Sequence, residues 1–200
     1  MGEQPLMSGS QNTRLANLHD VELAALAATG DRAAFGELVR RHGSAVRGLL
    51  RRMGAPAAEA DDVAQDAFLV AFERISEFRG QGAFVAWVKK ISARQYLRRL
   101  QRERRLASLA AEADEQAEIM PLRDTGDRID LDEALRSLGA AERICVSMCY
   151  GAGLSHAEAA DALNLPLGTV KSHVKRGVEK LRARLAPTAE AALEGRRDNG

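Results

Sequence analysis

Short polar and cationic side chains recur near the end of the chain at a spacing that places them on one face of a helix. These residues are Lys171, Ser172, Lys175, Arg176 and Lys180. The apolar residues between them fall on the opposite face, at Val170, Val174, Val178 and Leu181. Lysine and arginine bond guanine edges or phosphates, whereas serine and threonine mainly position a protein on a duplex. This stretch therefore predicts a helix that enters a DNA major groove.

A second helix must precede it to hold it in place. Ser155 and Glu158 have the spacing of a capping box, which predicts a helix start at Ser155. Pro166 ends that helix, because proline lacks an N–H and disfavours helical geometry in the residue before it. Thr169 is the predicted N-cap of the following helix. The pair predicts a helix-turn-helix; the alternative is an ordinary helical hairpin with a solvated basic face.

A second basic stretch lies near the middle of the chain, followed by an acidic one. Between residues 86 and 105 the single acid is Glu103, and the cations are Lys89, Lys90, Arg94, Arg98, Arg99, Arg102, Arg104 and Arg105. Residues 106–133 are strongly acidic, so a net charge of +1 conceals a segregated distribution. This pattern indicates a polyanionic partner and a linker that repels polyanions.

Other chemistries find little support. Cys145 and Cys149 are one helical turn apart in an apolar run, which favours small buried hydrophobes over a redox or metal role. A zinc site needs further ligands, and the four histidines are scattered. No serine or cysteine has a paired base, and no glycine loop suits a phosphate. We expect neither an enzyme, nor a cofactor, nor a bound metal.

The composition favours an all-α fold, since 46% of residues are hydrophobic but only 4% are aromatic. We expect two small helical domains joined by a flexible acidic linker. The predicted boundaries are a flexible N-terminal tail at 1–17, a helical domain at 18–105, the linker at 106–129, a second helical domain at 130–186 and a flexible C-terminal tail at 187–200.

In the first domain, apolar periodicity predicts four helices. Asp20 is the expected cap of a helix over Val21–Ala28, and Asp31 of a longer one. The third runs from Pro56 to about Phe78 and the fourth over roughly Ala83–Arg105, with a glycine-containing loop at 78–82 between them. The second domain begins with a helix lined by leucines from Leu131, followed by one at Ala141–Tyr150.

The chain has no apolar run long enough to span a membrane, and residues 1–17 contain no hydrophobic signal core. We therefore expect a cytoplasmic protein without direct membrane insertion.

Four segments, taken in order, resemble the extracytoplasmic-function (ECF) group of sigma-70-type factors of bacterial RNA polymerase. They are "DDVAQDAFLVAFERI", "FRGQGAF", "WVKKI" and "LSHAEAADALNLPLGTVKS". The resemblance extends from about Asp20 to Leu185. It implies a region 2-like bundle that binds core polymerase and melts the −10 promoter element. It also implies a region 4-like helix-turn-helix that reads the −35 element.

The resemblance also assigns residues to these roles. Polymerase binding falls to Asp62, Gln65, Asp66 and Leu69. Contact with the single-stranded −10 element falls to Arg79, Gly80, Gln81, Gly82, Lys89, Lys90, Arg94 and Arg98. Contact with the duplex −35 element falls to Thr169, Lys171, Ser172, Lys175 and Arg176. Family members often carry an acid at Gln81, asparagine at Arg94, aspartate at Arg98 and arginine at His173. Trp87 is either a core residue or a stacking platform.

The partners implied are core RNA polymerase, promoter DNA and an anti-sigma protein. The basic helix at 169–181 also resembles the output helix of LuxR-type helix-turn-helix transcriptional regulators. Regulators of that type carry a separate sensor or receiver domain, and a receiver needs alternating strands and helices. The first hundred residues lack the apolar β-branched runs that such strands require.

Overall fold

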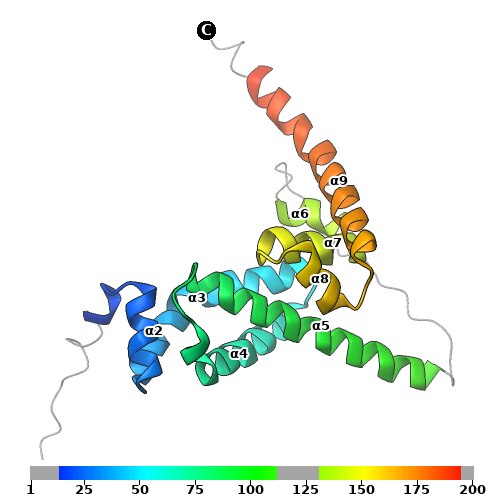
Figure 1. The fold of residues 1–200 in the computed structure, drawn as a ribbon. Coiled ribbons are helices and arrows are strands. Elements are labelled where there is room, and N and C mark those ends of the chain that lie inside the picture. Colours follow the sequence, from blue (N-terminus) through cyan, green and yellow to red (C-terminus); the bar gives the residue numbers. More distant parts are fainter. Residues whose placement is uncertain (1–13, 112–130, 195–200) are drawn as a thin grey trace, which may run out of the picture. The chain divides into compact units, whose positions relative to one another are not determined.

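The computed structural model describes residues 14–111 and 131–194, and every regular element in those ranges is a helix (Figure 1). The predicted all-α fold is confirmed. The chain divides into two compact units. Unit 1 comprises residues up to Arg51 together with Pro56–Ala93, and unit 2 comprises Arg52–Ala55 together with the chain from Arg94 onward.

Unit 1 is built from three helices, a short 3-10 turn and the start of a long fourth helix. They are α2 (Asp20–Ala28), α3 (Arg32–Met53), α4 (Ala57–Glu73), η1 (Ile75–Glu77) and α5 (Phe84–Ala111). Its core contains the fully buried Leu23, Leu38, Val46, Phe84 and Val88. Aliphatic side chains dominate this core, as the composition predicts.

The start of α2 differs from its prediction. Asp20 lies within the helix, and the N-cap is His19, whose backbone N–H donates to the Glu22 carboxylate at 2.7 Å. The Asp20 carboxylate instead accepts a bond from Arg41 Nη1 at 3.2 Å and lies 2.7 Å from His42 Nε2. The Asp20 side chain, which local spacing predicts to be a cap, therefore contacts α3 instead. The cap predicted at Asp31 is confirmed, because its Oδ1 accepts the N–H of Ala33 at 2.9 Å.

The packed part of the chain begins before residue 18. Leu15, which the sequence places in a flexible tail, is buried. The guanidinium of Arg41 donates to the backbone carbonyls of Leu15, Ala16 and Leu18 at 3.1, 2.8 and 2.8 Å. These bonds tie residues 15–18 to α3, so the predicted tail is too long at its C-terminal end.

Several helix ends also differ from prediction. α4 ends at Glu73 and is followed by η1, rather than continuing to Phe78. α5 extends to Ala111 and therefore includes residues 106–111 of the predicted linker, which are mostly the good helix formers alanine and leucine. The linker residues from 112 onward lie outside the described residues. Within the predicted C-terminal tail, residues 187–194 continue the last helix.

Unit 2 contains the elements of the predicted helix-turn-helix and the helices that support them. These are α6 (Leu131–Arg136), α7 (Ala140–Val146), the π-helical turn η2 (Ser147–Gly151), α8 (His156–Leu163) and α9 (Leu167–Glu194). Leu135, Leu138 and Val146 form a buried cluster, against which Val178 and Leu181 of α9 pack. α9 is thus anchored by one apolar face, as its periodicity predicts.

Cys145 is buried and Cys149 half-buried, and both are free thiols. Burial raises the pKa of Cys145 to about 11, which keeps this thiol protonated and unreactive. The structure therefore favours the packing role predicted for Cys145. None of the helices within the described ranges is long and apolar enough to cross a membrane.

Candidate nucleic-acid interface

The first helix of the helix-turn-helix begins with the predicted capping box. The Ser155 hydroxyl accepts the N–H of Glu158 at 3.2 Å, and the Glu158 carboxylate accepts the N–H of Ser155 at 2.9 Å. Ala159 and Ala160 are buried on the inner side of this helix. α8 and α9 contact each other (Figure 1), and small side chains such as these allow helices to approach closely.

The turn between the two helices depends on Asn164, which has left-handed backbone angles of φ 52° and ψ 45°. Asparagine tolerates this conformation better than most residues. α9 then begins at Leu167, so the prediction of Thr169 as its N-cap is wrong. The Thr169 N–H already donates to the Pro166 carbonyl at 2.9 Å, which places Thr169 inside the first turn.

The outer face of α9 presents the side chains predicted to read DNA. Lys171, Ser172, Lys175 and Arg176 are exposed, Thr169 is half-buried, and Val170 and Val174 are buried beneath them. The Ser172 hydroxyl donates to the Gly168 carbonyl at 2.8 Å, within its own helix. One helix therefore offers three cations to solvent in the register expected for a major-groove reader.

Glu142 lies beneath this face and was not identified from the sequence. It is buried in the first turn of α7, where its carboxylate accepts two bonds from Lys180 Nζ at 2.8 and 3.0 Å. Its Oε1 also lies 3.6 Å from Arg176 Nε. The hydrogen bonds from Lys180 lower the pKa of Glu142 despite its burial, so it is an anion at neutral pH. In the sequence, Glu142 looks like any acidic residue near the start of a helix, so its contacts with Arg176 and Lys180 could not be predicted.

The loop predicted to capture a −10 base lies between η1 and α5. Gly80 has φ 70° and Gly82 has φ 88°, a left-handed conformation that favours glycine, and both Arg79 and Gln81 are exposed. Phe78 begins this loop and packs edge-on against Phe84, with ring centroids 5.4 Å apart.

Phe78, Phe84 and Trp87 form an aromatic cluster that closes the base of the loop. The centroid of Trp87 lies 5.6 Å from that of Phe78 and 5.8 Å from that of Phe84. Trp87 is half-buried. These contacts favour its core interpretation over that of an open stacking platform.

The cations predicted to follow the single strand all lie on α5. Arg94 and Arg98 are exposed, and Lys89 and Lys90 are half-buried. Further along the helix, Glu103 lies 3.4 Å from Arg99 and offsets part of the positive charge. The Gly-containing loop and the start of this basic helix are therefore adjacent in the chain and in unit 1.

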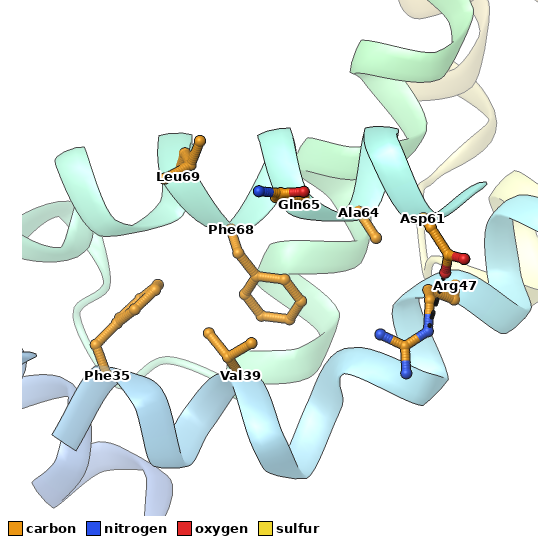
Figure 2. Close-up of a pocket in the computed structure, with 8 residues that line it drawn as sticks. All are labelled: Phe35, Val39, Arg47, Asp61, Ala64, Gln65, Phe68 and Leu69. Carbon is orange, nitrogen blue, oxygen red and sulfur yellow. Dashed lines mark ion pairs between the residues drawn. The ribbon is translucent and has the colours of Figure 1, made fainter. Parts of the chain in front are cut away.

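An open groove of about 400 Å³ lies between α3 and α4 (Figure 2). Its apolar surface comes from five side chains, which are Phe35, Val39, Ala64, Phe68 and Leu69. Arg47 and Asp61 form an ion pair at one end, with Nε and Oδ1 3.4 Å apart. Gln65 and Leu69 of the predicted polymerase-binding set line the groove.

Leu69 keeps 57% of its surface exposed and so offers an apolar contact beside the groove. Asp62 and Asp66 are exposed on the same helix without lining the groove. The sequence did not predict that α3 lines part of this groove. Phe35 and Val39 lie beside α4 only because α3 packs against α4.

Comparison with known proteins identifies two family regions in the chain. Residues 38–106 match the family described as Sigma-70 region 2, and residues 134–183 match Sigma-70, region 4. The chain is 35% identical to RNA polymerase sigma factor NccH of Alcaligenes xylosoxydans xylosoxydans, over 83% of this chain and 94% of that protein. It is 32% identical to ECF RNA polymerase sigma factor SigE of Mycolicibacterium smegmatis, over 80% of this chain and 65% of that protein.

A solved structure agrees with these relatives. The chain resembles CnrH, solved in complex with the cytosolic domain of CnrY, with 32% identity and a TM-score of 0.50. The similarity covers 84% of this chain and 97% of CnrH. These findings do not favour the LuxR-type alternative. With both sigma regions in order and relatives aligned along most of their length, the chain belongs to the ECF group of the sigma-70 family, whose members bind core RNA polymerase and direct promoter-specific initiation of transcription.

Proposed function

We propose that three surfaces of this sigma factor divide the work of initiation. The outer face of α9 reads the −35 element, the loop at 78–82 with α5 engages the −10 element, and the groove between α3 and α4 docks on core polymerase. The observation that carries the proposal is the two-sided character of α9. Its cations are exposed while Val170 and Val174 are buried.

At the −35 element, the N-terminal half of α9 enters the major groove. The second helix of a helix-turn-helix docks there and contacts base edges. Lys171, Lys175 and Arg176 supply charged donors to guanine edges and phosphates, while Thr169 and Ser172 position the helix.

At the −10 element, the loop holds a base flipped out of the non-template strand. Flipping costs a few kcal/mol, which hydrogen bonds and stacking in a pocket offset. Gly82 is exposed in this loop and Gly80 half-buried, and Phe78 at the start of the loop packs against Phe84. Lys89, Lys90, Arg94 and Arg98 then follow the phosphates of the single strand.

On the polymerase side, the apolar groove and the acids of α4 suit a basic helical partner. Asp62 and Asp66 supply the negative charge and Leu69 the exposed apolar contact. We further propose that the protein acts in the cytoplasm, without catalytic activity of its own. We also propose two domains joined by an acidic linker, with an anti-sigma protein as partner. CnrH, whose structure was solved with a domain of CnrY, supports that last proposal.

The main test is run-off transcription with purified core polymerase. A promoter is first selected from duplexes randomised over the −35 and −10 elements. The combined substitution K171A, K175A and R176A should abolish most promoter-specific transcripts, since each base contact is worth about 1–3 kcal/mol. Arg136→Ala removes an exposed cation from α6 and serves as the matched control. Unchanged transcription by the triple variant would exclude this face as the reader.

A loop exchange tests the −10 assignment. Replacing residues 79–82 with the loop of another family member should change base preference at the −10 element while holoenzyme assembly stays intact. Permanganate footprinting on a promoter library gives the preference, and assembly is measured in parallel. If the exchanged protein opens the same promoters, the loop is only a connector.

The groove is tested by Leu69→Glu, which places a charge beside its apolar wall. We expect weaker core-polymerase binding with the fold retained, because Leu69 is largely exposed. Glu73→Gln on the same helix is the control.

A pull-down from the native cell tests the anti-sigma proposal. Recovery of polymerase alone would contradict it.

A further inference from the structure

Glu142 of α7 contacts cationic side chains from two successive turns of α9. Arg176 and Lys180 are four residues apart, so they lie one turn apart on the same side of the helix. The Glu142 carboxylate lies between them, bonded to Lys180 Nζ and 3.6 Å from Arg176 Nε. Its side chain is only 10% exposed, whereas those of Arg176 and Lys180 are 56% and 57% exposed. A buried anion therefore contacts the charged groups of two side chains that are more than half exposed.

The packing around Glu142 restricts where its carboxylate can lie. Gly177 falls between Arg176 and Lys180 in sequence, and α7 approaches α9 closely at this glycine. A Cβ at Gly177 would lie 2.7 Å from Val146 Cγ2 and 3.5 Å from Glu142 Cβ. Because the two helices meet this closely, tertiary packing fixes the position of the Glu142 backbone and Cβ relative to α9.

Arg176 has a second contact, at the neighbouring nitrogen of its guanidinium. Its Nη2 lies 3.1 Å from His173 Nδ1. Because arginine only donates, a hydrogen bond between these atoms requires His173 Nδ1 to accept. The guanidinium therefore has an ion-pair contact with Glu142 at Nε and a shorter contact with His173 at Nη2, while other N–H groups remain available on an exposed side chain.

We infer that Glu142 and His173 are positioning residues that pre-orient Arg176 for base reading and so set its discrimination at the −35 element. This inference rests on the proposed role of Arg176. A long side chain held before binding loses less conformational freedom in the complex and presents its donors at one angle. Arginine recognises a guanine edge by two parallel hydrogen bonds, which form only at the right orientation. A guanidinium held in that orientation therefore discriminates better between bases.

Removing the charge of Glu142 should then have two opposite effects. Glu142→Gln keeps the size of the side chain but loosens Arg176 and Lys180 from the carboxylate. Base discrimination falls because Arg176 is no longer held. Attraction to any duplex stays the same or rises, because two cations gain freedom to contact phosphates. A residue with only a structural role would instead lower both kinds of binding together.

The experiment uses reconstituted holoenzyme and a duplex library randomised over the −35 element. For Glu142→Gln, discrimination at the base read by Arg176 should fall about 3- to 10-fold, which is less than the loss of a whole bidentate contact. Affinity for a duplex of mixed, non-promoter sequence should be unchanged or higher, with an equal or steeper salt dependence. Glu133→Gln is the matched control, because Glu133 pairs with Arg184 of the same α9 at 3.2 Å.

Two further variants separate this inference from the proposed function. Arg176→Ala should lose the same base preference, and Glu142→Gln should add nothing in that background. If Arg176→Ala changes no preference, the assignment of Arg176 fails and the inference fails with it. If Arg176→Ala loses the preference but Glu142→Gln and His173→Ala both keep it, only the positioning role is wrong. A parallel loss of thermal stability, specific binding and non-specific binding in Glu142→Gln would also overturn the positioning role.

Discussion

Gly177 shows how one residue limits the distance between two helices. It is buried on α9, and a Cβ there would lie 2.7 Å from Val146 Cγ2, closer than real side chains approach. Alanine is normally the better helix former by about 1 kcal/mol. At this position the steric clash should reverse that preference.

We predict that Gly177→Ala lowers the free energy of unfolding by about 1–3 kcal/mol, the usual cost of an overpacked contact. The measurement is chemical denaturation followed by circular dichroism. Gly168→Ala is the control on the same helix, because a Cβ there meets nothing within 4 Å. Equal effects from the two substitutions would mean that the close approach has no energetic consequence.

Glu37 is a buried carboxylate on α3 whose charge is balanced by two arginines. It accepts bonds from Arg40 Nε and Nη2, both at 2.7 Å, and from Arg41 Nε at 2.8 Å. These hydrogen bonds lower its pKa from the ordinary 4.5 to about 2. Since the folded pKa lies below the unfolded one, the stabilisation is present above pH 4.5 and is lost as the pH falls toward 2.

We predict that Glu37→Gln is less stable than the wild type at pH 7 and loses less stability between pH 4.5 and pH 2. Thermal midpoints measured across that range give the comparison. Glu73→Gln removes an exposed carboxylate from α4 and controls for the change in net charge. Parallel pH profiles for the wild type and Glu37→Gln would show that this cluster has no part in acid unfolding.

At the scale of the elements, the α8–α9 turn depends on a single left-handed residue. Asn164 has φ 52°, and the following N–H, that of Leu165, returns to the Ala160 carbonyl at 3.0 Å. The residue therefore both ends α8 and directs the chain into α9.

We predict that Asn164→Ala destabilises unit 2 by about 1–2 kcal/mol, since a left-handed conformation is unfavourable for residues with an ordinary Cβ. Asn164→Gly should be nearly neutral, because glycine adopts this region readily. Denaturation curves of the two variants provide the comparison, with −35 binding as a second readout. A glycine variant as damaged as the alanine variant would indicate that the side-chain amide, rather than the backbone, is what matters.

At the scale of the whole molecule, the two units carry different candidate binding surfaces. Unit 1 contains the aromatic cluster, the glycine loop and the groove, and unit 2 contains the helix-turn-helix. Together they carry all the surfaces that initiation requires of this protein in the proposed division of work.

We predict that limited proteolysis of the protein alone cuts first between residues 112 and 130. The acidic composition there favours a linker, whereas α5 already includes residues 106–111. Mass spectrometry of the early fragments locates the cuts. Initial cleavage inside α3 or the first half of α9 would contradict the proposed domain boundaries.

Much of this protein was determined by the sequence alone, wherever the deciding interactions are local. The capping box at Ser155 and Glu158, the cap at Asp31 and the two faces of α9 all depend on residues within one or two turns of each other. The order of the sigma segments likewise identified the family. The caps and the faces of α9 follow from helical geometry, so spacing is enough to predict them, whereas the family was indicated by resemblance to known sequences.

The tertiary structure decided what depends on residues distant in the chain. It paired Asp20 with α3 instead of a cap, built the groove from α3 and α4, and placed Glu142 beneath Arg176. It also showed that α9 begins before Thr169. Spacing along one helix predicts which side chains share a face. Only packing between helices determines which of them are buried and which charged groups form ion pairs.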